Sequence, residues 1–183
     1  MRPAIQRNMR IILISLLIVL PGFADDPWKV PSSEWTVADA QRLLGASPWS
    51  KTIDQSKIVV RWESASPVRL ALTQLNKRVE TDDDPCYAIA VIGLEMPSEP
   101  PRWEASLRAT GRKAITAVRV RMRDDGLVFV FPRDPEVQQP VVFRIPFNFK
   151  LGNTVEFEAR IGTQVVKQRF CLRRMTYTGR LEL

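Results

Sequence analysis

Apolar and polar side chains alternate in the second half of the chain with the two-residue period of a β-strand. Two such segments flank Asp125-Gly126, a dipeptide typical of a two-residue hairpin turn. That turn would place Met122 opposite Phe129 and would put the apolar side chains of both strands on one face. The alternation over residues 141–149 predicts a further strand.

The stretch TVEFEARIGTQVVKQRF, residues 154–170, predicts a second hairpin. A two-residue turn at its middle pairs Glu158 with Lys167 and Glu156 with Arg169. The same register pairs apolar residues on the other face, and a slip of one residue would scramble both faces. Although the two glutamates are spaced as a catalytic pair might be, this register favours the solvated face of a sheet.

Two segments in the first half have the pattern of short helices. Thr36 and Asp39 have the spacing of a capping box, and Gly45 suits the left-handed position that ends a helix. The apolar stripe expected for this helix is Val37, Ala40, Leu43 and Leu44. A second helix is predicted to begin with Ser66 as its cap and Pro67 in its first turn.

Strands are predicted around the second helix. Residues 57–64 form one candidate, and the nearly continuous apolar run of residues 86–96 is typical of a central strand that is covered on both faces. The stretch from Trp103 to Thr110, followed by Gly111, favours a short helix.

These elements predict the fold class α+β, with an antiparallel, β-rich sheet or sandwich and two or three short helices, mostly in the N-terminal half. The chain has 183 residues and a hydrophobic content of 45%, which suffices for a packed core. We expect a single domain over residues 25–183, with a mixed helix and strand part over 25–112 and an antiparallel β part over 113–183.

The first 24 residues differ from the rest and have the build of a secretory signal peptide. Three arginines precede the apolar run Ile11–Leu20, and small residues precede a cleavage site after Ala24. The alternative is an uncleaved membrane anchor, but ten helical residues rise only ~15 Å against a bilayer core of ~30 Å. We therefore expect an exported protein, periplasmic or secreted, with no transmembrane span after cleavage.

Charge and residue usage exclude several classes of function. The net charge of +7 includes the three leader arginines, so the mature chain carries only +4 and lacks the strongly basic character of a nucleic-acid-binding protein. The chain contains no histidine, which excludes Ser-His-Asp and Cys-His catalysis and histidine-based zinc sites. No glycine-rich nucleotide motif occurs, so we expect no cofactor and no bound metal.

Several stretches that span most of the mature chain occur together, in the same order, in a known group of proteins. They are WTVADAQRLLGASPW, VRWESASPVRLAL, YAIAVIGL, LVFVFPRDP and MTYTGRLEL. On these stretches the chain resembles small exported proteins of acidobacteria. That group has no assigned activity, ligand or catalytic residue, so the resemblance implies export and no particular chemistry.

Three groups of side chains are candidates for binding. The tryptophans could form an aromatic platform for sugars, although packing in the core is their usual role: Trp28, Trp35, Trp49, Trp62 and Trp103. The acidic run Asp82–Asp84 has oxygen ligands suited to calcium but lacks the spacing of a calcium-binding loop. A basic stripe could bind anionic polysaccharide or lipid headgroups, and its residues are Arg119, Arg121, Arg123, Lys167 and Arg169. Alternatively, these side chains could be the ordinary solvent-exposed face of a sheet or an edge protected by charge.

The two cysteines, Cys86 and Cys171, are expected to form a disulfide, because an exported chain folds in an oxidising compartment. Each lies at the end of a predicted strand, and antiparallel strands of one sheet would bring them together. The alternative is that each is a small buried apolar residue.

The leading functional hypothesis is an exported, non-enzymatic binding or interaction module, because an export signal accompanies a β-rich body without an assembled catalytic set. Candidate partners are a protein or an anionic polysaccharide of the cell envelope, and not nucleic acid. Two alternatives stay open. A small carboxylate-dependent secreted hydrolase requires two acidic side chains ~5–10 Å apart across a cleft, and an envelope-complex subunit requires an exposed apolar patch.

Overall fold

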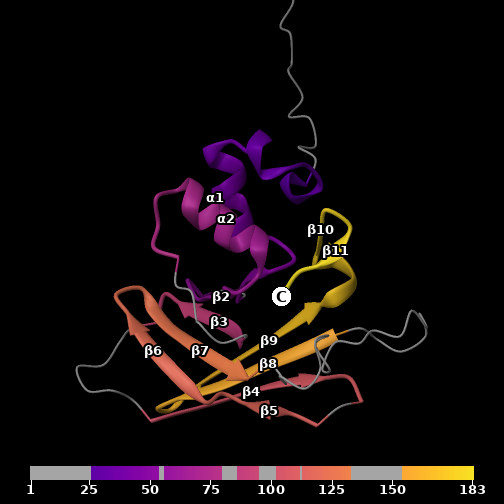
Figure 1. Cartoon of the computed structure of the whole chain (residues 1–183). Helices are drawn as coiled ribbons and strands as arrows, with labels where there is room; N and C mark the ends of the chain where they lie inside the picture. Colours follow the sequence, from indigo (N-terminus) through magenta and orange to yellow (C-terminus); the bar gives the residue numbers. More distant parts are fainter. Residues whose placement is uncertain (1–25, 54–55, 80–85, 95–101, 112, 133–153) are drawn as a thin grey trace, which may run out of the picture.

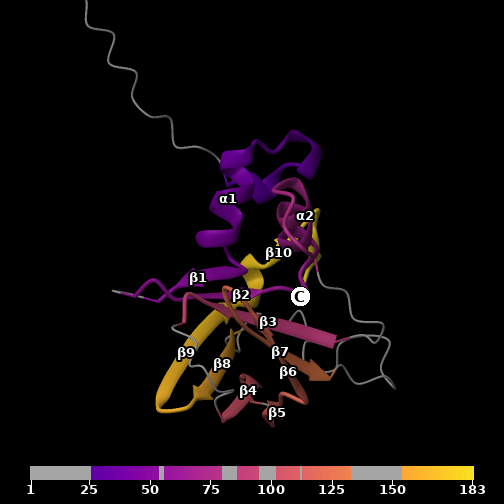
Figure 2. The same ribbon diagram turned by 90° about the vertical axis from the view of Figure 1, so that its left-hand side faces the viewer.

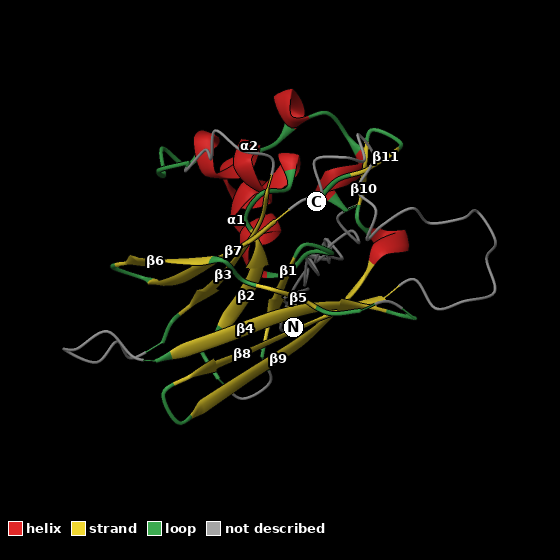
Figure 3. Ribbon diagram, turned by 60° about the horizontal axis from the view of Figure 1, so that its bottom comes forward, coloured by secondary structure: helices red, strands yellow, loops and turns green. Residues whose placement is uncertain are grey.

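The apolar side chains of the strands pack into a shared core between two antiparallel sheets that lie face to face (Figures 1 and 3). The computed structural model of the chain describes residues 26–53, 56–79, 86–94, 102–111, 113–132 and 154–183. The predicted leader, the acidic run Asp82–Asp84 and the expected strand over residues 141–149 lie outside these residues.

The first sheet has five strands in the order β1-β2-β3-β7-β6, and all its pairings are antiparallel. Its strands are β1 (Ser50–Thr52), β2 (Val59–Trp62), β3 (Cys86–Ile92), β7 (Gly126–Pro132) and β6 (Arg119–Arg123). The second sheet has four antiparallel strands, β5 (Ile115–Thr116), β4 (Trp103–Ala109), β8 (Thr154–Ile161) and β9 (Gln164–Cys171).

The core lies between the facing sides of the two sheets. Phe129 of β7 packs on Phe157 of β8 with ring centroids 5.8 Å apart, and Trp62 of β2 packs edge-on against Phe170 of β9 at 5.5 Å. All four side chains are fully buried. Such aromatic pairs contribute about 0.5–1.5 kcal/mol each beyond the area that they bury. The expected β-rich, antiparallel architecture with short N-terminal helices is therefore confirmed.

A helical cap covers the β1–β2 end of the sandwich (Figure 2). It consists of the short turns η1 (Pro27–Lys29) and η2 (Ser32–Glu34) and the helices α1 (Val37–Gly45) and α2 (Ser66–Gln74). The predicted capping box is confirmed: the Asp39 amide donates to Thr36 Oγ1 at 3.2 Å, and the Thr36 amide donates to Asp39 Oδ2 at 2.9 Å. The Thr36 hydroxyl also donates to Asp39 Oδ2 at 2.7 Å, and this bond together with the one from the Thr36 amide lowers the pKa of Asp39 below its usual value.

The segment 172–183 connects the four-stranded sheet to the helical cap. It contains the turn η4 (Leu172–Arg174) and the two-stranded ribbon β10 (Thr176–Tyr177) and β11 (Arg180–Leu181). The indole Nε1 of Trp49 donates to the Glu182 carbonyl at 2.7 Å, and the Ser32 amide donates to the Tyr177 hydroxyl at 2.9 Å. Leu183 is buried against the same core.

One of the two remaining predictions for residues 86–110 is wrong and the other is confirmed. The expected helix from Trp103 to Thr110 is wrong, because this stretch forms β4 and buries Ala105, Leu107 and Ala109 against the core. Its composition suits a helix, but pairing with β8 along its whole length overrides that weak local preference. By contrast, the buried central strand predicted from Cys86 is confirmed as β3, which lies between β2 and β7.

The register of the β6–β7 hairpin differs from the prediction by two residues. Met122 pairs with Leu127 and not with Phe129, because the turn consists of Asp124 and Asp125. Gly126 is the first residue of β7, where a Cβ atom would lie 2.0 Å from the Val91 carbonyl oxygen. The glycine therefore permits the close approach of β3. A shift of two residues keeps each side chain on its expected face.

The side chains at the helix ends also differ in part from the prediction. Gly45 is the last residue of α1 and does not have a left-handed conformation, and Val37 of the expected stripe is 57% exposed. The residue that caps α2 is Ala65, one position earlier than expected. The Ser66 hydroxyl instead donates to the Glu182 carboxylate, so it ties α2 to the segment 172–183.

Candidate functional site

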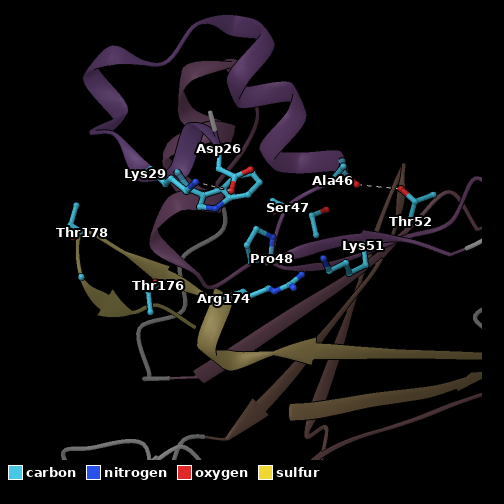
Figure 4. Close-up of a pocket in the computed structure, with 14 residues that line it drawn as sticks. Asp26, Lys29, Ala46, Ser47, Pro48, Lys51, Thr52, Arg174, Thr176 and Thr178 are labelled. Carbon is cyan, nitrogen blue, oxygen red and sulfur yellow. Dashed lines mark hydrogen bonds and ion pairs between the residues drawn. The ribbon is translucent and has the colours of Figure 1, made fainter. Parts of the chain in front are cut away.

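A pocket of about 830 Å³ opens where η1, the loop after α1, β1 and the segment 172–183 meet (Figure 4). Its charged lining residues are Asp26, Lys29, Lys51 and Arg174, and Trp28 and Thr176 also line it. We call it the Lys51 pocket. Its walls come from both ends of the described chain, so the pocket exists only in the folded protein.

Local packing holds the two central cations in place. Lys51 is the middle residue of β1, an edge strand that pairs with β2, and the Trp62 amide adds a hydrogen bond to the Trp49 carbonyl at 2.8 Å. Arg174 ends η4, a turn closed by the bond from the Met175 amide to the Leu172 carbonyl at 3.0 Å. Figure 4 shows the two cationic side chains pointing toward one another.

The pocket brings a partly buried cation, Lys51, near an exposed one, Arg174. Burial lowers the pKa of Lys51, the nearby Arg174 lowers it further, and Cys171 acts in the opposite direction. Within the part of the chain that the structure describes, neither Lys51 nor Arg174 forms a side-chain hydrogen bond or an ion pair. Asp26 is the one carboxylate among the described lining residues.

That carboxylate is already engaged at the rim. Asp26 forms ion pairs with Lys29 at 3.4 Å and with Arg42 at 3.5 Å. The Arg42 guanidinium also lies 5.8 Å from the ring centroid of Trp28, within the range of a cation–π contact. Lys51 and Arg174 therefore line the pocket without an opposing carboxylate among the described residues.

The tryptophans do not form the platform considered from the sequence. Trp35, Trp49 and Trp62 are buried in the core, and Trp103 is half-buried in the four-stranded sheet. Only Trp28 lines the Lys51 pocket, with its ring edge-on to Trp49 at 6.3 Å between centroids. It supplies a single aromatic wall.

The structure divides the candidate basic stripe between opposite faces of the sandwich. On β6, Arg121 pairs with Val128, whose neighbour Phe129 faces the core, so the β6 arginines lie on the outer side of the five-stranded sheet. By the same argument, Lys167 and Arg169 of β9 lie on the outer side of the four-stranded sheet. They therefore do not join Arg119, Arg121 and Arg123 in one surface.

The predicted register of the β8–β9 hairpin is confirmed at every pair. Lys167 Nζ lies 3.0 Å from Glu158, and Arg169 lies 3.8 Å from Glu156. Each glutamate is thus paired with a cation on a solvent-facing sheet. The arrangement does not form a catalytic carboxylate pair.

A buried ionic network on the outer side of the five-stranded sheet was not predicted. Arg61 Nε donates to Glu63 Oε2 at 2.8 Å, and Arg123 donates to Glu63 at 2.7 Å and to Asp125 at 2.8 Å. The side chains of Arg61 and Glu63 are each only 5% exposed. The signal in the sequence was an Arg and a Glu two positions apart in an apolar strand, which places both on one face.

Two members of the network, Arg123 and Asp125, have shifted pKa values. Burial lowers the pKa of Arg123, but the hydrogen bonds and charges of Asp125 and Glu63 outweigh it and raise the pKa above its usual value. The hydrogen bond from Arg123 lowers the pKa of Asp125. Arg123 and Asp125 therefore stabilise each other in their ionised forms.

The predicted disulfide is wrong in this structure. Cys86 begins β3 in the five-stranded sheet, whereas Cys171 ends β9 in the four-stranded sheet, and the two are not bonded. The prediction required both strands to belong to one sheet. Because the chain builds two layers, the two strand ends lie apart.

Among the described residues, no group of three or more acidic or cysteine side chains is placed to hold a metal ion. None of the described helices has the length and apolar character needed to cross a membrane. Comparison of the chain with protein-family models, with curated proteins and with solved structures found no match. The geometry of the Lys51 pocket is thus the main guide to function.

Proposed function

We propose that this protein is an exported, non-enzymatic binding module that holds an anionic ligand in the Lys51 pocket. The observation that carries the proposal is the convergence of Lys51 and Arg174 in a partly buried pocket without an opposing carboxylate. Lys51 is partly buried, and the like charge of Arg174 disfavours its charged form, so a bound anion would offset that cost. The N-terminal sequence with the build of a signal peptide supports export.

The choice of a binding module over an enzyme rests on the residues at the pocket. The chain has no histidine, and the described lining residues offer one carboxylate that is already paired with Lys29 and Arg42. General acid–base catalysis needs a group that exchanges a proton beside the reacting atoms. Lys51 and Arg174 instead place two positive charges near each other without a second carboxylate among the described lining residues, which suits recognition of an anion.

Ligand binding is tested by thermal unfolding and calorimetry in a buffer of weakly binding ions. We expect an anionic panel of carboxylates, phosphates and sulfates to raise the melting temperature of the wild-type protein, since a ligand that binds only the folded state stabilises it. Lys51→Met with Arg174→Gln should abolish the rise. The matched control, Lys77→Met with Arg69→Gln, changes exposed cations outside the pocket and should retain it.

Equal melting temperatures with and without every anion would contradict the proposal, as would an unchanged response of the pocket double variant. Export is tested separately by N-terminal sequencing of protein recovered outside the cytoplasm. We expect the sequence to begin at Asp25. A protein that retains Ile11–Leu20 would instead be a tethered domain.

A further inference from the structure

We infer that the anion recognised by the Lys51 pocket is the phosphate monoester of a small polar molecule such as a sugar. This inference rests on the proposed function and adds the chemical class of the ligand. Three features of the pocket carry it: the number of unopposed charges, the number of free hydrogen-bond donors, and the volume beside an aromatic wall.

The charges match a dianion. Lys51 and Arg174 contribute two positive charges, and the ion-paired group of Asp26, Lys29 and Arg42 adds a net charge of +1 beside them. A phosphate monoester carries about −1.5 to −2 charges at neutral pH, whereas a carboxylate carries one. A carboxylate would therefore leave one of the two converging cations without a counter-charge.

The donors match an anion with three oxygens. The Arg174 guanidinium and the Lys51 ammonium provide several N–H donors. Three of the lining hydroxyls are already used, since each donates to a backbone carbonyl: Ser50 to Leu44, Thr52 to Gly45 and Thr178 to Tyr177. Two further hydroxyls line the pocket and keep a proton to donate: Ser47, whose oxygen accepts from the Trp49 amide at 3.2 Å, and Thr176.

The volume leaves room for an organic group. A pocket of about 830 Å³ far exceeds one phosphate ion and falls within the range of small-molecule sites. Trp28 provides an apolar wall beside the cations, and aromatic walls suit the C–H faces of sugar rings. The phosphate would bind the cations, while the rest of the ligand would contact Trp28.

The test uses the purified chain, in the length recovered after expression of the full sequence, and four soluble probes in phosphate-free buffer. They are glucose 6-phosphate, inorganic phosphate, glucuronate and glucose. By isothermal titration we expect glucose 6-phosphate to bind about tenfold or more tightly than glucuronate, because it makes an additional charge-assisted contact. Inorganic phosphate should bind more weakly than glucose 6-phosphate, and glucose should not bind.

The outcomes separate this inference from the proposed function. Glucuronate binding as tight as glucose 6-phosphate would overturn the phosphate assignment and leave the anion-binding function standing. Inorganic phosphate binding as tight as glucose 6-phosphate would overturn the organic part of the ligand. Vesicles of phosphatidic acid, another phosphate monoester, test for a lipid source, and binding to them alone would overturn the assignment to a small soluble molecule. Absence of binding by every anion would overturn both proposals.

Variants show whether the pocket is responsible. Lys51→Met and Arg174→Gln should each weaken glucose 6-phosphate binding by about tenfold or more, whereas Lys77→Met and Arg69→Gln should leave it unchanged. In phosphate-free buffer the Lys51→Met protein should melt at the wild-type temperature or higher, since a partly buried charge facing Arg174 has been removed. Equal binding by wild type and both pocket variants would overturn the assignment of the site.

Discussion

Replacement of Glu63 with glutamine should destabilise the protein far more than any surface charge change. Glu63 lies between Arg61 and Arg123, and the side chains of Glu63 and Arg61 are each only 5% exposed. Glutamine keeps the shape but removes the negative charge, so Arg61 would be left buried without its counter-charge. Removal of one partner of a buried pair costs about 3–5 kcal/mol. We expect about 3 kcal/mol, because Arg123 keeps its contact with Asp125.

Urea unfolding monitored by tryptophan fluorescence measures this loss, since Trp62 lies next to Glu63 in the chain and is buried. The matched control is Glu156→Gln, which removes a charge that is 39% exposed and pairs with Arg169 at 3.8 Å. Exposed pairs of that kind contribute about 0–1 kcal/mol, so the control should unfold near the wild-type midpoint.

A double-mutant cycle completes the test. Arg61→Met alone leaves Glu63 with Arg123 as its remaining partner and should also destabilise the protein. Arg61→Met combined with Glu63→Gln removes both buried charges and should cost much less than the sum of the two single changes. If Glu63→Gln costs less than about 1 kcal/mol, or if the double variant is merely additive, the network does not carry the stability argued for it.

Three further predictions concern the hairpins. The charge reversal Glu158→Lys should lower the free energy of unfolding by a few tenths of a kcal/mol, as measured by urea unfolding. Adding Lys167→Glu should recover part of this loss in low salt but not in 1 M salt, whereas additive losses in low salt would contradict the observed pairing. Gly126→Ala should lower the free energy of unfolding by about 2–5 kcal/mol, because the added Cβ would clash with the β3 backbone. Gly162→Ala has open space around its Cβ and should lower it by only about 1–2 kcal/mol, so equal losses would refute the clash. The hydrogen bond from Arg123 lowers the pKa of Asp125 in the folded state, so ionised Asp125 stabilises the fold above the unfolded pKa of about 3.9, and this stabilisation is lost as the pH falls through the lower folded value. Asp125→Asn should therefore reduce the loss of stability below about pH 4, and an acid unfolding profile equal to that of the wild type would contradict this prediction.

Local signals predicted those parts of the fold in which neighbouring residues decide the structure. The Thr36 capping box and the pairing of Glu158 with Lys167 were both readable because each involves residues close in the sequence. The strand β4 was misjudged because its partners, β5 and β8, were not known from local composition. Gly126 was assigned to a turn, because a close approach of β3 leaves no mark in the neighbouring residues.

The candidate site could not be predicted in the same way. Lys51 and Arg174 are far apart in the sequence, and neither belongs to a motif, so only the folded arrangement of β1 and η4 brings them together. The basic residues of β6 and β9 had the clearest pattern in the sequence, yet the two-layer architecture separates them. A strand pattern predicts which face a side chain occupies but not which layer its strand joins.

The hydrogen bond between Trp49 and the Glu182 carbonyl has a consequence for biosynthesis. A ribosome makes the helical cap early, but the partners of Trp49, Ser32 and Ser66 lie in residues 177–182 and are made much later. Before those residues are made, the indole of Trp49 lacks its hydrogen-bond acceptor, and Ser32 and Ser66 lack their partners in the C-terminal segment. The helical cap can therefore be completed only after residues 177–182 have been made, and a chain cut short before residue 177 would present an incomplete cap to chaperones and proteases.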